Sequence, residues 1–408
     1  MIYLEIFPAD YGDCFLFSFK DKNNKETNIL IDGGTTNTFD YFSEKLKSID
    51  VLDLIVVTHI DEDHINGIKK LLNENQKLIN PKIVKVKELW FNGFKHIHLN
   101  KVIKAKYTEK EKEQLKLFEV KDSGRKDFQD IALKESINLT KTIYDLGYDN
   151  IWNTTFGKGP VVLEKGNRPI IVNDSIKIYL LTPTQKDLDK LDEYCLKKFK
   201  EKVSPNTQIK DDEHAIEFVW ENILIKEKPK KKNIKNISLT DLDIDKLINT
   251  KFVEDDSKSN KSSISFILEC SLENKTIKIL FLGDSFCTDV IKSLDELNKQ
   301  NYELKFNAIK VSHHGSNGNT SPKLLEMIES DYFIISTNGE KHKHPDLETI
   351  LWILNSNKDK PIKFIFNYHT EISKKMNLSD IKEKFQNFEI IEVNLQKSEK
   401  ENSYLLKF

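Results

Sequence analysis

Four side chains that can bind a metal ion stand within six consecutive positions of this 408-residue chain. They are His59, Asp61, Asp63 and His64, and they follow the apolar run from Leu54 to Val57. Imidazole nitrogens and carboxylate oxygens this close in sequence can converge on one or two divalent cations. A helix cap needs one such residue rather than four, so the pattern favours a metal site over a capped polar turn.

Other potential ligands occupy the same kind of position, at the end of an apolar run. Asp32 is followed by two glycines, which permit a tight turn and bring the backbone close to whatever the carboxylate faces. Alone, Asp32 would be an ordinary turn residue as readily as a functional one. Asp284 ends a second apolar run, and the adjacent pair His313 and His314 ends a third. These positions supply a second group of potential ligands far along the chain.

The hydrophobic pattern predicts the elements that position these residues. Alternating or continuous β-branched runs predict strands at 2–8, 14–19, 28–31, 54–57, 88–91, 169–172, 175–181, 263–269, 277–282, 308–311, 332–336, 363–366, 389–393 and 403–406. Helical spacing predicts helices at 39–49, 65–72, 109–120, 128–146, 289–297, 322–328 and 347–354. Each ligand group therefore lies at the end of a strand, which is where α/β proteins place their sites.

The composition limits the class of protein without naming a partner. Lys and Arg number 63 and Asp and Glu 65, so the net charge of −2 argues neither for nor against nucleic acid. The four cysteines are widely spaced, as in reduced thiols of a cytosolic protein. No run of about 18 apolar residues and no basic signal segment occurs, so we expect a cytoplasmic protein with no membrane association.

The order of elements predicts a single domain over residues 1–408. Its core would comprise residues 1–95, 166–183 and 256–408, and two helical insertions would occupy about 96–165 and 184–255. The second insertion contains a basic run at 228–235. Such a run is usually a solvated loop, and contact with nucleic acid is the less favoured interpretation.

The motifs, taken in order, resemble those of the metallo-β-lactamase superfamily. They are Gly12-Asp13, Asp32-Gly33-Gly34, Thr58-His59-x-Asp61-x-Asp63-His64, Gly283-Asp284 and His313-His314-Gly315-Ser316. More narrowly, they are similar to the branch represented by the competence DNA-uptake protein ComEC, which has THxDxDH and a later His-Pro loop, here Asn338-Gly339 through His344-Pro345. The resemblance implies an α/β (α+β) fold, the αβ/βα sandwich of two mixed β-sheets flanked by helices, with a metal site along one edge.

The resemblance also implies two divalent metal ions, Zn²⁺ or Mn²⁺, and a role for each residue. The implied ligands are His59 and Asp61 for one ion, Asp63 and His64 for the second, Asp284 between both, and either His313 or His314 for the second ion. Asp61 stands where a histidine is commoner, and an oxygen ligand favours Mn²⁺ over Zn²⁺. Asp32 and Ser316 are implied as supports of the ligands, and Asn338 and His344 as substrate contacts.

Two such ions would make hydroxide available near neutral pH, with Asp63 and His344 as the expected catalytic groups. We expect a hydrolase, and the favoured interpretation is a phosphodiesterase or nuclease acting on DNA or RNA, in anti-phage defence with a separate effector protein as partner. Two alternatives stay open. One is a thioester, lactone or phosphoester hydrolase of a small molecule, and the other is a metal-bound sensor or scaffold that acts with a partner effector.

Overall fold

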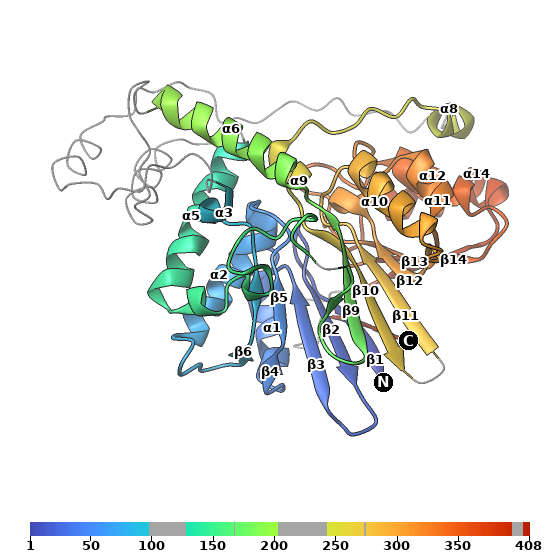
Figure 1. The fold of residues 1–408 in the computed structure, drawn as a ribbon. Coiled ribbons are helices and arrows are strands. Elements are labelled where there is room, and N and C mark those ends of the chain that lie inside the picture. Colours follow the sequence, from blue (N-terminus) through green and yellow to red (C-terminus); the bar gives the residue numbers. More distant parts are fainter. Residues whose placement is uncertain (98–127, 167, 203–242, 273–274, 394–402) are drawn as a thin grey trace.

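Two β-sheets pack face to face, and helices cover the outer face of each (Figure 1). The computed structural model describes residues 1–97, 128–166, 168–202, 243–272, 275–393 and 403–408. This four-layered arrangement confirms the predicted sandwich of two mixed sheets flanked by helices.

The first sheet comes from the N-terminal part of the chain and its last strand. It contains β1 (Ile2–Ile6), β2 (Phe15–Lys20), β3 (Glu26–Ile31), β5 (Leu54–Val56), β7 (Leu89–Trp90) and β16 (Tyr404–Lys407), in the order β16-β1-β2-β3-β5-β7. Strands β16 to β3 pair antiparallel, whereas β3, β5 and β7 pair parallel. The parallel part brings the ends of β3 and β5 to the same edge, where Asp32 and the turn at 58–64 follow.

The second sheet has the order β15-β14-β13-β12-β11-β10-β9-β8. Its strands are β8 (Ile170–Ile171), β9 (Ile176–Thr182), β10 (Ser265–Leu272), β11 (Lys275–Phe281), β12 (Lys305–Lys310), β13 (Glu329–Ile335), β14 (Ile362–Phe366) and β15 (Phe388–Glu392). From β11 to β15 the strands pair parallel. The ends of β11 and β12 therefore also share an edge, and Asp284 and the histidine pair follow them.

The longer helices form the outer layers. Helices α1 (Thr38–Leu46), α2 (Glu62–Asn75) and α5 (Phe128–Asp145) cover the first sheet, and α10 (Cys287–Lys299), α11 (Pro322–Met327) and α12 (Leu347–Ser356) cover the second. In α2 the buried residues Ile65, Ile68, Leu71 and Leu72 recur at helical spacing, which explains why that face packs on the sheet.

The remaining elements are short or lie at the edges, apart from the long helix α6. They are α3 (Phe94–Ile97), α6 (Gln185–Lys202), α8 (Ile244–Ile248), α9 (Lys258–Lys261), α13 (Glu371–Lys375), α14 (Ser379–Lys384), the 3₁₀ turns η1 (Tyr148–Asn150), η2 (Thr154–Phe156) and η3 (Ser312–Gly315), and the paired strands β4 (Val51–Leu52) and β6 (Lys85–Val86).

The core between the sheets follows from the alternation of side chains along each strand. Ile2, Leu4 and Ile6 of β1 are buried in it, as a period of two requires. Across the interface, the ring centroids of Phe15 and Phe281 lie 5.9 Å apart. The two sheets are thus held against each other by apolar contact, which fixes the relative position of their edges.

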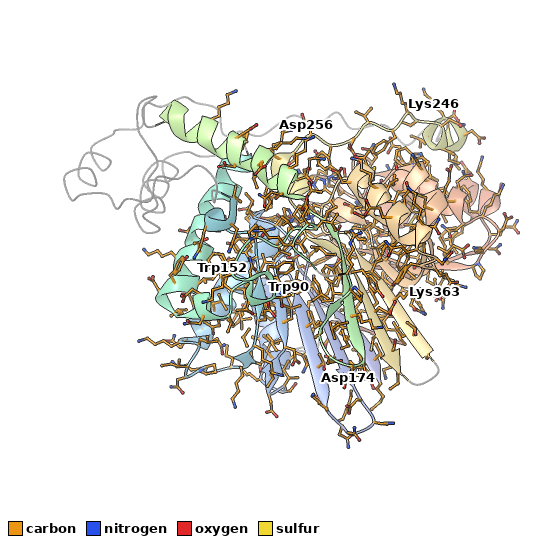
Figure 2. The ribbon with its side chains drawn as sticks, viewed as in Figure 1. Trp90, Trp152, Asp174, Lys246, Asp256 and Lys363 are labelled. Carbon is orange, nitrogen blue, oxygen red and sulfur yellow. The ribbon has the colours of Figure 1, made fainter. Side chains whose placement is uncertain are left out.

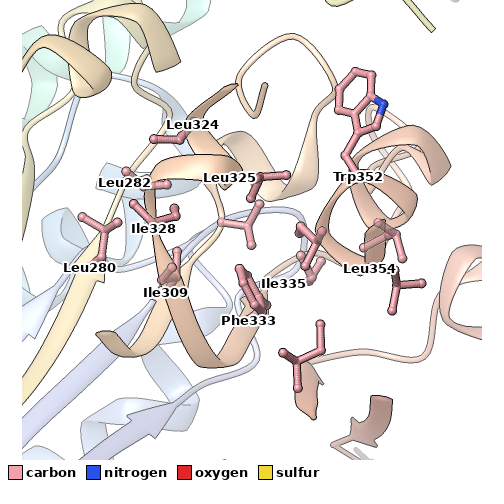
Figure 3. Packing of buried hydrophobic residues seen from close by; sticks show 14 of the residues in the cluster. Leu280, Leu282, Ile309, Leu324, Leu325, Ile328, Phe333, Ile335, Trp352 and Leu354 are labelled. Atoms are coloured by element: carbon pink, nitrogen blue, oxygen red, sulfur yellow. The ribbon is translucent and has the colours of Figure 1, made fainter. Parts of the chain in front are cut away.

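A separate core lies outside the second sheet, where strand residues such as Phe333 face Leu325 of α11 and helix α12 (Figure 3). On the other side, Trp90 and Trp152 lie in the first-sheet half (Figure 2), and Trp152 Nε1 donates to the carbonyl of Phe91 at 2.8 Å. Both tryptophans are buried, so neither offers a free ring for stacking on a base.

One boundary near the site differs from the prediction. Helix α2 begins at Glu62 rather than at Ile65, and Asp61 stands at its N-cap in an extended conformation. The helical spacing of apolar residues reveals only the buried face of the helix. The first turn is polar, so it shows no such spacing. As a result, Asp63 and His64 lie on the first turn of α2.

The extents of the two insertions and the single-domain organisation stay predictions. Residues 98–127 and 203–242 lie outside the described residues, and they include the helix predicted at 109–120 and the basic run at 228–235. The helix predicted at 128–146 is α5. None of the described helices is long and apolar enough to span a membrane.

Candidate metal centre

Four histidine rings from two segments of the chain point their Nε2 atoms at one carboxylate oxygen, which a third segment supplies. The distances to Asp284 Oδ2 are 3.6 Å from His59, 3.7 Å from His64, and 3.8 Å from both His313 and His314. The turn after β5, the turn after β11 and the turn after β12 therefore meet at one edge of the sandwich. This convergence joins the two ligand groups that the sequence places far apart.

The two other predicted carboxylates lie at different sides of this cluster. Asp61 Oδ2 is 3.5 Å from His59 Nε2, and Asp63 Oδ2 is 3.4 Å from His314 Nε2. His59, His64 and Asp284 form one group of atoms close enough to hold an ion, and Asp63, His64 and His314 form another. The two groups share His64, and Asp284 belongs to the first of them.

The rings from the first sheet are fixed by hydrogen bonds at their other nitrogen. His64 Nδ1 lies 2.8 Å from Asp32 Oδ2, and His59 Nδ1 lies 3.0 Å from Thr58 Oγ1. Asp32 also accepts hydrogen bonds from the Thr58 amide at 2.7 Å and hydroxyl at 2.8 Å. A single buried carboxylate thus orients His64 directly and His59 through Thr58, which leaves both Nε2 atoms for a metal.

The rings from the second sheet are fixed in the same way. His314 Nδ1 lies 2.8 Å from the carbonyl oxygen of Ser336, and His313 Nδ1 lies 2.9 Å from Asn319 Oδ1. Since both partners accept hydrogen bonds, Nδ1 carries the proton when the ring is neutral, and Nε2 of the neutral ring has the lone pair that can bind a metal. All four rings therefore present the atom that binds metal.

An unusual backbone conformation presents the two adjacent rings together. His313 (φ 45°, ψ 53°) and His314 (φ 54°, ψ 20°) are both in the left-handed region, which residues with a side chain rarely adopt. Such strain persists where the surroundings hold it, and it is common at functional sites. Here it lets consecutive side chains approach the same carboxylate.

Several buried polar atoms at the site have no hydrogen-bond partner among the described residues. They are the Nε2 atoms of His59, His64 and His314 and the Oδ1 atoms of Asp61 and Asp284. A buried polar group without a partner costs about 1–3 kcal/mol. A divalent cation would coordinate the imidazole nitrogens among these atoms, and mixed imidazole and carboxylate donors suit Zn²⁺ or Mn²⁺. The donor set therefore fits the metal ions implied by the motifs.

The electrostatics of the site favour positive charge. Burial lowers the pKa of His314, but Asp284 and Asp13 outweigh it and raise that pKa to about 9. Burial alone would raise the pKa of Asp284, yet the surrounding imidazoles hold it well below its usual range. The same field that stabilises a proton on an imidazole attracts a metal cation in its place.

Two charged residues at the site were not assigned a role from the sequence. Lys310, the last residue of β12, is 1% exposed and forms an ion pair with Asp13. Asp13 belongs to a quoted motif, and its neighbour Gly12 lies so close to α2 that a Cβ there would sit 1.8 Å from the Asp63 carbonyl oxygen. The sequence signal for Lys310 was a charged residue among the apolar residues Ala308, Ile309 and Val311, directly before the turn with the two histidines.

The remaining predicted residues lie around the cluster. The ring of His344 is 5.0 Å from that of His313, and its Nδ1 is 3.4 Å from Asp346 Oδ2. Asn338 Oδ1 accepts a hydrogen bond from Glu340 within its own loop. Ser316 Oγ accepts one from the Gly318 amide, which supports the turn after the histidine pair. One neighbour was missed: the exposed His342, whose ring lies 5.9 Å from that of His344.

Comparison with known proteins finds one family that is similar to the first part of the chain. Residues 8–148 match the model of the metallo-beta-lactamase superfamily. No curated protein matches the chain. Among solved structures, a long form RNase Z from yeast is similar at 11% identity and a TM-score of 0.35, over 99% of this chain and 41% of that one. This chain thus spans about two fifths of the length of the yeast protein.

The narrower likeness to the ComEC branch rests on the motifs and stays a prediction. The matched segment contains Asp13, Asp32 and the turn from His59 to His64, which supply one side of the histidine and carboxylate cluster. The sheets and helices around it have the layered order expected of that fold. Over residues 8–148 the chain is therefore similar to the metallo-β-lactamase superfamily.

Proposed function

We propose that this protein is a metal-dependent hydrolase that cleaves phosphodiester bonds, with DNA or RNA as the substrate class. The observation that carries the proposal is the convergence of four imidazole Nε2 atoms on Asp284 Oδ2, at 3.6 to 3.8 Å. A structural role would not require four oriented rings with free lone pairs around one buried carboxylate.

We assign the ligands by their neighbours. Asp63 and His64 would hold one ion with His314, because His314 Nε2 faces the Asp63 carboxylate at 3.4 Å. His59 and Asp61 would hold the other, and His313 would supply the further nitrogen that this ion otherwise lacks. Asp284 would contact both. The carboxylate of Asp61 favours the harder Mn²⁺ at the ion that it would share with His59.

When bound, the two cations would lower the pKa of a water molecule and polarise an oxygen of the substrate. The residues of the chain provide the rest. Asp63, on the first turn of α2, would orient the attacking water and accept its proton. His344, beside His313, would donate a proton to the leaving oxygen.

The outer rings support a substrate with phosphoryl oxygens. The ring of His344 lies 5.0 Å from that of His313, and His342 lies in the same loop, with its ring 5.9 Å from that of His344. A neutral imidazole has one N–H group, so His344 would offer a hydrogen-bond donor at the edge of the metal cluster. Phosphate oxygens accept such bonds readily.

The test is hydrolysis by the purified protein loaded with Mn²⁺ or Zn²⁺. Substrates are single- and double-stranded DNA, RNA and bis-p-nitrophenyl phosphate, with thioesters and lactones in parallel. We expect phosphodiester cleavage by the wild-type protein and by Asp295→Asn, an exposed control on α10, and none by Asp284→Asn. Cleavage of thioesters or lactones alone would replace the proposal with an acyl hydrolase.

We also propose a biological context, on the motif likeness alone: a cytoplasmic protein of anti-phage defence that acts with an effector partner. Phage plating on cells carrying wild-type protein or Asp284→Asn tests it. Protection that persists in the variant would favour the sensor or scaffold alternative.

A further inference from the structure

Lys310 has three polar neighbours although its side chain is only 1% exposed. Its Nζ pairs with Asp13, donates to the carbonyl oxygen of Gly283 at 3.1 Å and lies 3.7 Å from Asp284 Oδ1. Each neighbour belongs to a segment that builds the metal centre. A buried ammonium is costly to keep, and apolar residues often replace a buried ion pair without loss of stability. The placement of Lys310 therefore calls for a role at the centre.

The contact with Gly283 fixes the turn that carries Asp284. Gly283 has φ 51°, a conformation that glycine adopts easily, so the turn needs other contacts to hold it. Its carbonyl oxygen accepts from Lys310 and also from the amide of His313 at 3.0 Å. Lys310 thus ties the turn after β11 to the turn after β12.

The contact with Asp284 distinguishes the two oxygens of that carboxylate. Oδ1 lies on the side of Lys310, at 3.7 Å, whereas Oδ2 is the atom that faces the four imidazoles. Attraction of Oδ1 by the ammonium would keep the carboxylate from rotating. Oδ2 would then stay directed at the imidazole rings. Asp13, in turn, holds Lys310 from the other sheet and lies 3.5 Å from His314 Nδ1.

We propose that Lys310 is a positioning residue of the metal centre: it anchors Gly283 and Asp284 so that Oδ2 is presented to both ions. The proposal rests on the metal site of the proposed function, and it names a residue that binds neither metal nor substrate. Lys310 acts from behind the carboxylate, through Asp284.

The direction of the change in metal affinity distinguishes a positioning role from a purely electrostatic effect of the ammonium on the cations. Lys310→Met removes a positive charge near the cations. The loss of Coulomb repulsion alone would therefore make the variant bind Mn²⁺ more tightly. Loss of positioning would make it bind more weakly. We expect at least tenfold weaker Mn²⁺ binding by Lys310→Met, measured by titration and by the metal content after dialysis. Equal or tighter binding would overturn the proposal.

A double variant keeps the test valid if the single variant folds poorly. Lys310→Met leaves Asp13 as an unpaired buried carboxylate, and Asp13→Asn with Lys310→Met removes both charges. We expect the pair of changes to restore the thermal stability of the metal-free protein but not its Mn²⁺ affinity. Full recovery of affinity would show that Lys310 serves only to neutralise Asp13, against the proposal.

The electron paramagnetic resonance spectrum of the Mn²⁺-loaded protein gives a readout independent of hydrolysis. We expect exchange coupling between two Mn²⁺ ions in the wild-type protein and its loss in the double variant. Two coupled ions without phosphodiester cleavage would refute the proposed function and leave the role of Lys310 standing. Coupling that persists in the double variant would refute the role of Lys310 alone, and a wild-type protein that binds no metal would refute both.

Discussion

His64 Nδ1 lies 2.8 Å from Asp32 Oδ2, and both residues are buried at the junction of β3, β5 and α2. The pair fixes the ring so that Nε2 faces Asp284. Because the same carboxylate holds Thr58, which contacts His59, the orientation of two proposed ligands depends on one side chain.

Removing this support should weaken the site without removing a ligand. For Asp32→Ala we expect about 10–100-fold lower metal affinity, the usual effect of losing a hydrogen-bond partner of a metal-binding histidine. Metal content and hydrolysis rate measure it, and Asp40→Ala on the exposed face of α1 is the control. Unchanged affinity would show that packing alone orients the two rings.

The two adjacent histidines should serve different ions. His314 faces Asp63, whereas His313 is held by Asn319, so His313→Ala and His314→Ala should each reduce the metal content from two ions to about one. Addition of excess Mn²⁺ should restore more activity to one variant than to the other. The exposed His369→Ala is the control, and loss of both ions in both variants would contradict separate assignments.

His344 should affect catalysis rather than metal binding. If it donates a proton to the leaving group, His344→Ala should lower kcat by about 10²–10⁴-fold with the metal content unchanged. His342→Ala on the same loop is the matched comparison, and we expect mainly a higher KM. A substrate with a good leaving group, such as bis-p-nitrophenyl phosphate, should lose less rate in His344→Ala than DNA does.

Stability should depend on pH in opposite ways with and without metal. In the metal-free protein the pKa of His314 is raised to about 9. The protonated ring therefore contributes to the free energy of unfolding below about pH 6.5, and this contribution is lost as the pH rises through 9. We expect the free energy of unfolding of the chelated protein to fall over this window, by on the order of 3 kcal/mol.

With Mn²⁺ present the trend should reverse, because the ion binds only the neutral imidazole and its affinity rises as protons leave. Thermal unfolding at pH 6.5 and 9, with chelator or with Mn²⁺, measures both trends. His314→Asn should show a weaker pH dependence, and parallel curves with and without metal would contradict the assignment of His314 as a ligand.

Metal removal should lower the melting temperature. An ion that binds only the folded state stabilises it by about 2.7 kcal/mol at a concentration 100 times its Kd. Chelation should therefore shift the melting temperature downward and abolish activity, and added Mn²⁺ should restore both. The Asp284→Asn protein provides the control, since its melting temperature should respond little to chelator.

The sequence was sufficient for the layers of the fold and for the segments that build the site. Strand β5 is a continuous apolar run, and an apolar run that is followed by His or Asp predicts a sheet edge that carries potential ligands. The start of α2 was placed too late because its first turn is polar and lacks the buried period. Motifs with local spacing were therefore easier to predict than helix ends.

What the sequence could not show was the set of contacts between distant segments. That Asp32 holds Thr58 as well as His64, and that Lys310 reaches Asp13, depends on how the two sheets pack. The left-handed conformation of His313 and His314 is equally invisible, because non-glycine residues rarely adopt it. These contacts decide the orientation of the proposed ligands, whereas the types of these residues can be read from short motifs in the sequence.

The division of the ligands between two sheets has a consequence for biosynthesis. The histidines at 59 and 64 belong to the half that leaves the ribosome first, and Asp284 with His313 and His314 belongs to the half that leaves last. A nascent chain that ends before residue 284 cannot assemble the cluster, so metal loading should follow translation of the second half. Premature termination would then yield a product that is unable to acquire its cations.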